Sequence, residues 1–295
     1  MAPVAPFKQD SANQSGTTMT VVALWHSVAH KALCCIADTR LSRLTGSTTT
    51  DNGPKIFQVP VTLNVQLPDQ LEYEVRARQS FGFAFSGSAL AAVNTYSLAV
   101  ACTQNLRGVQ DSPPAVSVEE VARLFRSIAD HYIRDMSSRL GTGELISQFF
   151  FDGFVFGFCP VVGDFKAFMT RAGFVDGAFL VDITERSVLP GNACVMGSGT
   201  DEFLRIAGDR QREGKNDSPI AILKEMLRIQ TVRSVGGHVQ IGVDDTNGFR
   251  ILPVVSQVGD PEEWSTTFLG WDATAAGPIG GYGIGYRGFG FEGIE

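Results

Sequence analysis

The sequence predicts an α+β protein built as a four-layer αββα sandwich, in which two facing antiparallel sheets carry helices on their outer faces. The prediction follows from the order of segments along the chain: strands, two helices, strands, two helices and strands again. When two sheets pack against each other and each carries two helices on its outer side, both faces of each sheet are buried. With 44% hydrophobic and 19% charged residues, the chain of 295 residues has enough apolar side chains for such a core.

The first half of the chain begins with strands and continues with helices. Apolar, β-prone runs at residues 20–25 and 32–37 are joined by a short polar stretch, which predicts a buried β-hairpin. More strand-like sequence extends over residues 55–85. An apolar helix is expected over residues 88–102, and the capping box Ser117-Val118-Glu119-Glu120 predicts the start of a second helix.

The second half of the chain shows the same alternation. Apolar, β-prone runs come before and after two segments with helical spacing, so further strands and a second helical pair are expected. The strands are expected at residues 149–158, 178–183, 192–196, 237–243 and 250–255, and the helices at residues 201–207 and 218–232.

The apolar residues of these runs are expected to form the core. Cys34 and Cys35 are neighbours on one strand, so their side chains should point to opposite faces as small buried apolar groups. The expected core members are Val22, Leu24, Leu33, Cys35, Phe83, Phe85, Val155 and Val195.

The composition changes at both ends of the chain. Residues 1–18 contain Pro, Ser, Asn and Gln without any period, which is typical of an extended leader or propeptide. Residues 259–295 are rich in glycine and aromatic residues, and we expect an irregular tail that is flexible or acts as a docking arm. The globular domain is therefore expected over residues 19–258.

Charge and cysteine content exclude several function classes. The net charge is −7, the pI is about 5.2 and no run of Lys or Arg exceeds two residues, so nucleic acid is not an expected partner. No apolar run approaches the roughly 20 residues of a membrane span. The five cysteines are scattered and form no CxxC pair, which indicates a reducing cytoplasm.

No cofactor and no metal are expected. The four histidines have no metal-ligand spacing. A literal GxGxxG pattern at Gly283, Gly285 and Gly288 has neither a strand before it nor room for a helix after it, so it is not interpreted as a nucleotide site.

Four short motifs resemble one known family. They are Ile36-Ala37-Asp38-Thr39-Arg40, Gly53-Pro54-Lys55-Ile56-Phe57, Phe85-Ser86-Gly87-Ser88-Ala89 and Met196-Gly197-Ser198-Gly199. In order and spacing they resemble the motifs of proteasome β subunits, which belong to the N-terminal-nucleophile (Ntn) hydrolases. The resemblance spans roughly residues 19–255 and implies the αββα fold of that family.

The resemblance also implies a mechanism. In these enzymes a Thr exposed as the first residue attacks through its hydroxyl, and its own α-amino group accepts the proton. A lysine next to it lowers the pKa values of the hydroxyl and the amine, and a carboxylate orients the lysine. The resemblance gives these roles to Thr20, Lys55 and Asp38.

Further residues of the site follow from the same resemblance. A backbone N–H at the turn formed by Ser86 or Gly87 is expected to stabilise the oxyanion. Ser198 is expected to hydrogen-bond the amine, and Ser234 belongs to the same proton network. Structural interpretations remain open for each residue alone: Asp38 with Arg40 as an exposed strand end, Lys55 as a solvated edge-strand charge, and Ser86 and Ser198 as turn and N-cap residues.

The chain departs from the family pattern in two places. Family members carry an Asp three residues before the Ser that corresponds to Ser234, and here that position is Thr231. In the family, a small residue of the first strand follows the catalytic Thr by four positions. Counting back four positions from Ala23 leads to Met19. Thr20 needs a slightly longer hairpin, whereas Thr17 and Thr18 follow Gly16 in the more familiar cleavage junction.

The expected function is that of a threonine peptidase that loses its leader and cleaves amide bonds. Its partners would be peptide or unfolded protein substrates, further copies of the chain in a ring, and an unfoldase. Two alternatives remain open: a catalytically silent structural subunit with an unprocessed N-terminus, and an Ntn amidohydrolase of small amides.

Overall fold

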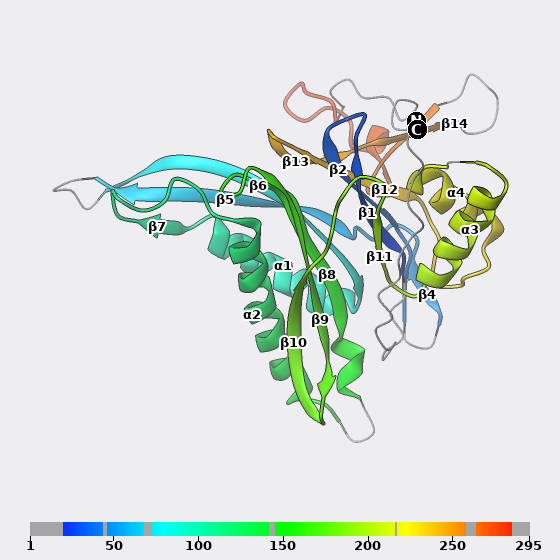
Figure 1. Cartoon of the computed structure of the whole chain (residues 1–295), viewed down its shortest axis with the longest axis horizontal. Helices are drawn as coiled ribbons and strands as arrows, with labels where there is room; N and C mark the ends of the chain where they lie inside the picture. Colours follow the sequence, from blue (N-terminus) through cyan, green and yellow to red (C-terminus); the bar gives the residue numbers. More distant parts are fainter. Residues whose placement is uncertain are drawn as a thin grey trace.

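The protein is a mixed α+β structure (Figure 1). The computed structural model describes residues 20–43, 46–67, 72–141, 145–215, 217–257 and 264–284. The leader expected at residues 1–18 lies outside these ranges, as do Thr17, Thr18 and Met19. The described residues form four α-helices, an antiparallel five-stranded sheet, a curled six-stranded sheet and two small sheets.

The five-stranded sheet is built around the N-terminal hairpin. Its strands lie in the order β11 (Ala193–Met196), β1 (Val22–Ser27), β2 (Ala32–Asp38), β12 (Val239–Asp245) and β13 (Gly248–Leu252). The predicted hairpin is confirmed, since β1 and β2 pair antiparallel from Val22 opposite Ala37 to Ser27 opposite Ala32.

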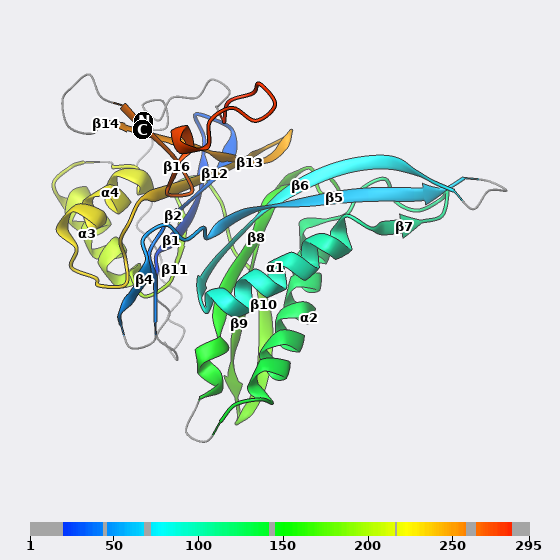
Figure 2. The same ribbon diagram turned by 180° about the vertical axis from the view of Figure 1, so that it is seen from behind.

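The six-stranded sheet curls, and its longest hairpin extends away from the other sheet (Figures 1 and 2). Its order is β10 (Ala178–Glu185), β9 (Asp164–Val175), β8 (Phe151–Cys159), β6 (Tyr73–Gly87), β5 (Ile56–Gln66) and β7 (Leu106–Gly108). All neighbours are antiparallel except β5 and β7.

Strand β9 is an element that sequence analysis missed. Its central residues, from Ala167 to Thr170, are buried on both faces of the sheet. This removes the alternation of apolar and polar residues that marks a strand with one solvent-exposed face. Lys166 and Arg171 flank the buried stretch and interrupt the apolar run further.

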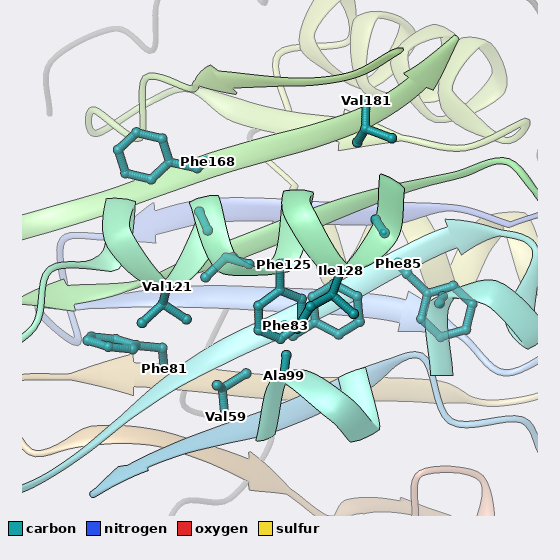
Figure 3. Packing of buried hydrophobic residues seen from close by; sticks show 14 of the residues in the cluster. Val59, Phe81, Phe83, Phe85, Ala99, Val121, Phe125, Ile128, Phe168 and Val181 are labelled. Atoms are coloured by element: carbon teal, nitrogen blue, oxygen red, sulfur yellow. The ribbon is translucent and has the colours of Figure 1, made fainter. Parts of the chain in front are cut away.

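Helices α1 (Ala89–Thr103) and α2 (Val118–Ser137) cover one face of the six-stranded sheet. The predicted capping box is confirmed: the Glu120 N–H donates to Ser117 Oγ at 3.1 Å, and the Ser117 N–H donates to the Glu120 carboxylate at 2.9 Å. In the cluster beneath, the Phe125 ring of α2 lies 4.7 Å from the Phe83 ring of β6 (Figure 3).

Helices α3 (Thr200–Arg212) and α4 (Pro219–Ile229) pack on the five-stranded sheet. Ser218 caps α4, and Pro219 occupies its first turn, where a missing N–H costs nothing. Buried residues of both helices, including Phe203 and Leu223, meet Ala23, Cys34 and other residues of the sheet.

A third cluster of buried apolar residues joins the inner faces of the two sheets. It contains Val22, Leu24 and Cys35 from one sheet and Phe154 and Phe156 from the other. Cys34 and Cys35 belong to different clusters, so the prediction that they point to opposite faces is confirmed. Of the predicted core residues, all are buried except Val195, which is half-buried and packs against the cluster beneath α3 and α4.

The C-terminal segment corrects one expectation. Residues 259–295 were expected to be irregular, but β15 (Trp264–Phe268) pairs with β14 (Val254–Gln257) and with β16 (Trp271–Asp272). Thr266 and Thr267 have high strand propensity, and the pairing supplies hydrogen bonds that the local composition does not reveal. A further small sheet joins β3 (Leu41–Ser42) to β4 (Thr48–Thr50).

None of the helices in the described part of the chain offers an apolar stretch sufficient for a membrane span.

Asp244 is a buried carboxyl at the contact between the two sheets. Its Oδ1 accepts a hydrogen bond from the Phe158 N–H of β8 at 2.7 Å, and its Oδ2 has no hydrogen-bond partner among the described residues. Burial raises the pKa of Asp244 to about 8, with a further increase from the charge of Asp245 and an opposing effect from Arg250.

The raised pKa predicts a pH dependence of stability. Between about pH 4 and pH 8 the folded protein binds a proton at Asp244 that the unfolded chain releases, so this group's contribution to stability is lost as pH rises towards 8. Asp244→Asn removes that loss. Its free energy of unfolding relative to wild type should increase from pH 5 to pH 8 by at least about 1.4 kcal/mol, the equivalent of one pKa unit. Urea unfolding at both pH values measures the difference, and equal differences at the two pH values would contradict the assignment.

Candidate functional site

Several residues proposed from sequence meet where β2 ends and β5 begins. Asp38 is the last residue of β2, and Lys55 immediately precedes β5. The Lys55 Nζ lies 2.8 Å from Asp38 Oδ1, and both side chains are 0% exposed. The predicted ion pair is confirmed, and the interpretation of Lys55 as a solvated edge-strand charge is wrong.

The Asp38 carboxylate connects three separate segments. Its Oδ1 accepts from the Val21 N–H at 3.1 Å as well as from Lys55. Its Oδ2 accepts from the backbone N–H groups of Arg40 and Gly236, both at 3.1 Å. Because Val21 and Lys55 share one acceptor atom, the lysine ammonium lies beside the backbone at the start of β1.

Burial shifts the protonation of Lys55. Loss of water lowers the pKa of the ammonium group below its ordinary value, and the charge of Asp38 and its hydrogen bond offset part of this decrease.

Gln240 is a residue of this site that sequence analysis missed. It lies on β12 with 0% exposure. Its Oε1 accepts from the Lys55 N–H at 2.9 Å, and its Nε2 donates to the carbonyl groups of Asp38 at 3.0 Å and Gly53 at 2.9 Å. The side chain therefore fixes the backbone on both sides of the ion pair. The available signal was a lone Gln in the apolar strand sequence Val239-Gln240-Ile241.

Gln240→Leu should lower the free energy of unfolding by roughly 2–3 kcal/mol, because it leaves three buried backbone groups without partners. Gln58→Leu is the control, since the Gln58 side chain is exposed and donates one hydrogen bond, to the Phe249 carbonyl. Its expected cost is about 1 kcal/mol. Chemical denaturation of both variants gives the comparison, and equal costs would contradict the role assigned to Gln240.

Thr20 lies two residues before β1 and is 1% exposed. Its backbone N–H donates to Ser198 Oγ at 3.2 Å, and its carbonyl accepts from the Gly199 N–H at 3.0 Å. Gly197 is required here, because its φ is +102° and a Cβ would strike the Thr20 carbonyl oxygen. The turn between β11 and α3 therefore holds the nitrogen of Thr20 against Ser198.

Ser198 and Ser234 lie within hydrogen-bond distance. Their hydroxyl oxygens are 2.7 Å apart, and either atom can be the donor. The N-cap of α3 is Gly199, so the alternative interpretation of Ser198 as an N-cap is wrong. The structure thus connects the Thr20 nitrogen, Ser198 and Ser234 in one hydrogen-bonded chain.

The turn from β6 into α1 lies next to this chain. Ser86 is 0% exposed, and its Oγ has no hydrogen-bond partner among the described residues. The Cβ of Ser86 lies 3.4 Å from the point where a Cβ on Gly197 would sit, so Ser86 lies close to the Thr20 segment. Gly87 has φ +105° and approaches the Phe150 carbonyl too closely for any Cβ.

Arg40 ties the loop that follows α4 to the site. Its guanidinium binds the Asp51 carboxylate through Nε at 2.6 Å and Nη2 at 3.1 Å, and it donates to the Arg233 carbonyl at 3.1 Å. The Arg40 N–H donates to Asp38, and also to the Gly236 carbonyl at 3.0 Å. Arg40 is thus not the exposed half of a weak surface pair.

The described residues contain no group of three or more His, Cys, Asp or Glu side chains suited to hold a metal ion. The site combines a buried ammonium–carboxylate pair that accepts from the Val21 N–H, the Ser198 and Ser234 hydroxyl groups linked to the Thr20 nitrogen, and the Gly87 turn nearby. A scan of protein-family models found none that matches this chain, and a search among curated proteins found no match either.

Proposed function

We propose that this protein is an N-terminal-nucleophile hydrolase of the proteasome β type, in which Thr20 cleaves amide bonds. The proposal includes the αββα sandwich of that class, with α1 and α2 outside one sheet and α3 and α4 outside the other. The observation that carries it is the fully buried Lys55–Asp38 pair. The same Asp38 oxygen that accepts from Lys55 also accepts from the Val21 N–H, next to Thr20. A buried charge pair is costly to maintain, so its bond to the backbone N–H that follows Thr20 favours a catalytic role.

The proposed reaction begins once the peptide bond before residue 20 is broken. The free α-amino group of Thr20 takes the proton of the Thr20 hydroxyl, and Oγ1 attacks the substrate carbonyl carbon. The Lys55 ammonium stabilises the negative charge that develops on Oγ1, and Asp38 keeps the lysine in place. The Gly87 turn offers a backbone N–H for the tetrahedral oxyanion.

The intermediate then collapses in two steps. The C–N bond breaks, and the ammonium group of Thr20 gives its proton to the leaving amine. This leaves an ester between the substrate acyl group and Thr20 Oγ1. Water, deprotonated by the same amine, cleaves the ester and restores the hydroxyl. The net reaction converts an amide and water into a carboxylic acid and an amine.

Peptides or unfolded proteins are the proposed substrates, with self-association into rings and an unfoldase as a partner. The cytoplasm is the proposed location. These proposals rest on the resemblance of the four sequence motifs to proteasome β subunits and on the net charge of −7, which does not favour polyanionic partners.

A second candidate is a catalytically silent structural subunit of the same fold. Two observations favour it. Thr231 occupies the position at which an acid was expected, and in the chain with residue 19 attached the Thr20 nitrogen is an amide that donates to Ser198. An amide nitrogen cannot act as the base.

The two candidates are separated by assaying three forms of the protein on N-acylated fluorogenic peptide amides. The forms are a chain released from a fusion so that Thr20 is its first residue, the same chain with Thr20→Ala, and the full chain with residues 1–19. Hydrolysis by the first form, with Thr20→Ala at background, supports the hydrolase. Equal hydrolysis by the Thr20→Ala form refutes Thr20 as the nucleophile, and background rates in all three forms favour the silent subunit.

A further inference from the structure

The start of helix α3 holds the loop at residues 230–236, here called the Ser234 loop, through two side-chain contacts. Ser198, just before the helix, lies 2.7 Å from Ser234, oxygen to oxygen. Glu202, in the first turn of the helix, accepts a hydrogen bond from the Thr231 hydroxyl at 2.8 Å. On the helix side the two contacting residues, Ser198 and Glu202, are four positions apart, and on the loop side Thr231 and Ser234 are three positions apart.

The Glu202 carboxylate is held in its charged form by Arg205. Arg205 donates to this carboxylate through Nε at 2.7 Å and Nη2 at 2.9 Å. These bonds, together with the hydrogen bond from Thr231, lower the pKa of Glu202 to about 2. A carboxylate can only accept, so the Thr231 hydroxyl must be the donor and its orientation is fixed.

The Ser234 loop packs closely on the helix start and is held from its other side as well. A Cβ on Gly199 would strike Val235 and Val21, so the glycine allows the loop to approach. On the other side, Arg40 binds the Arg233 carbonyl at 3.1 Å. Ser234 therefore lies between a residue held by Glu202, Thr231, and a residue held by Arg40, Arg233.

We infer that Glu202 is a positioning residue of the site: through Thr231 it holds the Ser234 hydroxyl against Ser198, which accepts from the Thr20 nitrogen. Sequence analysis found no acid in the Ser234 loop itself, because Thr231 stands at that position. The structure brings a carboxylate to the same threonine from helix α3. The inference about catalysis rests on the proposed function, whereas the inference about loop position does not.

The test compares Glu202→Ala and Thr231→Val with the matched control Glu225→Ala. Glu225 on α4 forms the same ion pair with an Arg three residues later, at 2.8 and 2.7 Å, and within the described part of the chain it makes no hydrogen bond to the Ser234 loop. Hydrogen exchange at the amides of Val235 and Gly236 is measured in the full chain. We expect about tenfold faster exchange in both test variants, the effect of losing one hydrogen bond, and no change in Glu225→Ala. Unchanged exchange in Glu202→Ala would overturn the inference.

Kinetics of the chain beginning at Thr20 give the second readout. Glu202→Ala should lower kcat about tenfold with little change in KM, whereas Glu202→Gln, whose Oε1 still accepts from Thr231, should recover most of the loss. In Glu202→Ala the Ser198 hydroxyl should be less well oriented towards the Thr20 amine. The protonated amine is then less stabilised, and the acid limb of the pH–rate profile should move to lower pH. Faster exchange with unchanged kcat would contradict the catalytic part. If wild type does not hydrolyse the substrate, the proposed function fails and the exchange result alone decides the position of the loop.

Discussion

Asp38→Ala is expected to lower the free energy of unfolding by roughly 3–5 kcal/mol. The substitution leaves the buried Lys55 ammonium without its counter-charge and removes the acceptor of the Val21, Arg40 and Gly236 N–H groups. The Val21 and Gly236 N–H groups are expensive to leave unpaired, whereas the Arg40 N–H keeps its bond to the Gly236 carbonyl. Urea denaturation followed by circular dichroism measures the loss, and failure to accumulate folded protein agrees with the upper end of the range.

Two controls make this expectation specific. Asp130→Ala removes an exposed partner of Arg134 on α2 and should cost less than about 0.5 kcal/mol. Lys55→Met should cost less than Asp38→Ala, because the Asp38 carboxylate keeps three backbone donors. Adding Lys55→Met to Asp38→Ala should restore part of the stability by removing the uncompensated charge. A cost of Asp38→Ala below 1 kcal/mol would show that the pair is not buried as described.

Lys55→Met should reduce the turnover of the chain beginning at Thr20 by about 10³-fold, with a much smaller change in KM. The reason is electrostatic: the ammonium stabilises charge on the Thr20 oxygen only as the reaction proceeds, so its loss affects the transition state more than substrate binding. Methionine occupies a similar volume and contains no positive charge. Initial rates over a range of substrate concentrations separate kcat from KM.

Lys166→Met is the control for the turnover of Lys55→Met. Lys166 pairs with Glu185 at 2.6 Å on the surface, far along the six-stranded sheet from β5. Its substitution should leave turnover unchanged. Wild-type turnover by Lys55→Met would remove the lysine from the mechanism.

Some parts of this structure were predictable because their causes are local. The capping box of α2 is complete within four residues, and the opposite faces of Cys34 and Cys35 follow from the two-residue period of a strand. The Asp38–Lys55 pair was predictable only from the resemblance of its two flanking motifs to a known family, since neither residue alone indicates burial.

Other parts depend on contacts that no local pattern contains. Gln240 bonds to residues that precede it by 185 to 202 positions, so a lone polar residue in a strand was the only trace of its role. The same holds for Glu202, whose partner Thr231 lies 29 residues away. Strand β9 was missed because its buried centre lacks the alternation of a half-exposed strand, and because Lys166 and Arg171 keep it from forming the continuous apolar run by which β2 and β8 were recognised.

The surroundings of Thr20 also depend on long-range contacts. Counting along the sequence pointed to Met19, whereas the structure places the Thr20 nitrogen on Ser198 and the next backbone N–H on Asp38. Thr17 and Thr18 lie outside the described residues. The sequence favoured Thr20 because it stands immediately before the apolar strand, and the structure adds hydrogen bonds around Thr20 that sequence spacing does not reveal.

The central claim is that a free Thr20 amine is the base of an active enzyme, and the identity of the first residue in active protein tests it most directly. Protein produced from the full chain is separated by activity on a fluorogenic peptide amide, and the active fraction is examined by intact mass and N-terminal sequencing. The account predicts a chain that begins at Thr20. An active chain that begins at Thr17 or Thr18 would contradict the choice of nucleophile, and an active chain that still carries residues 1–19 would contradict the mechanism.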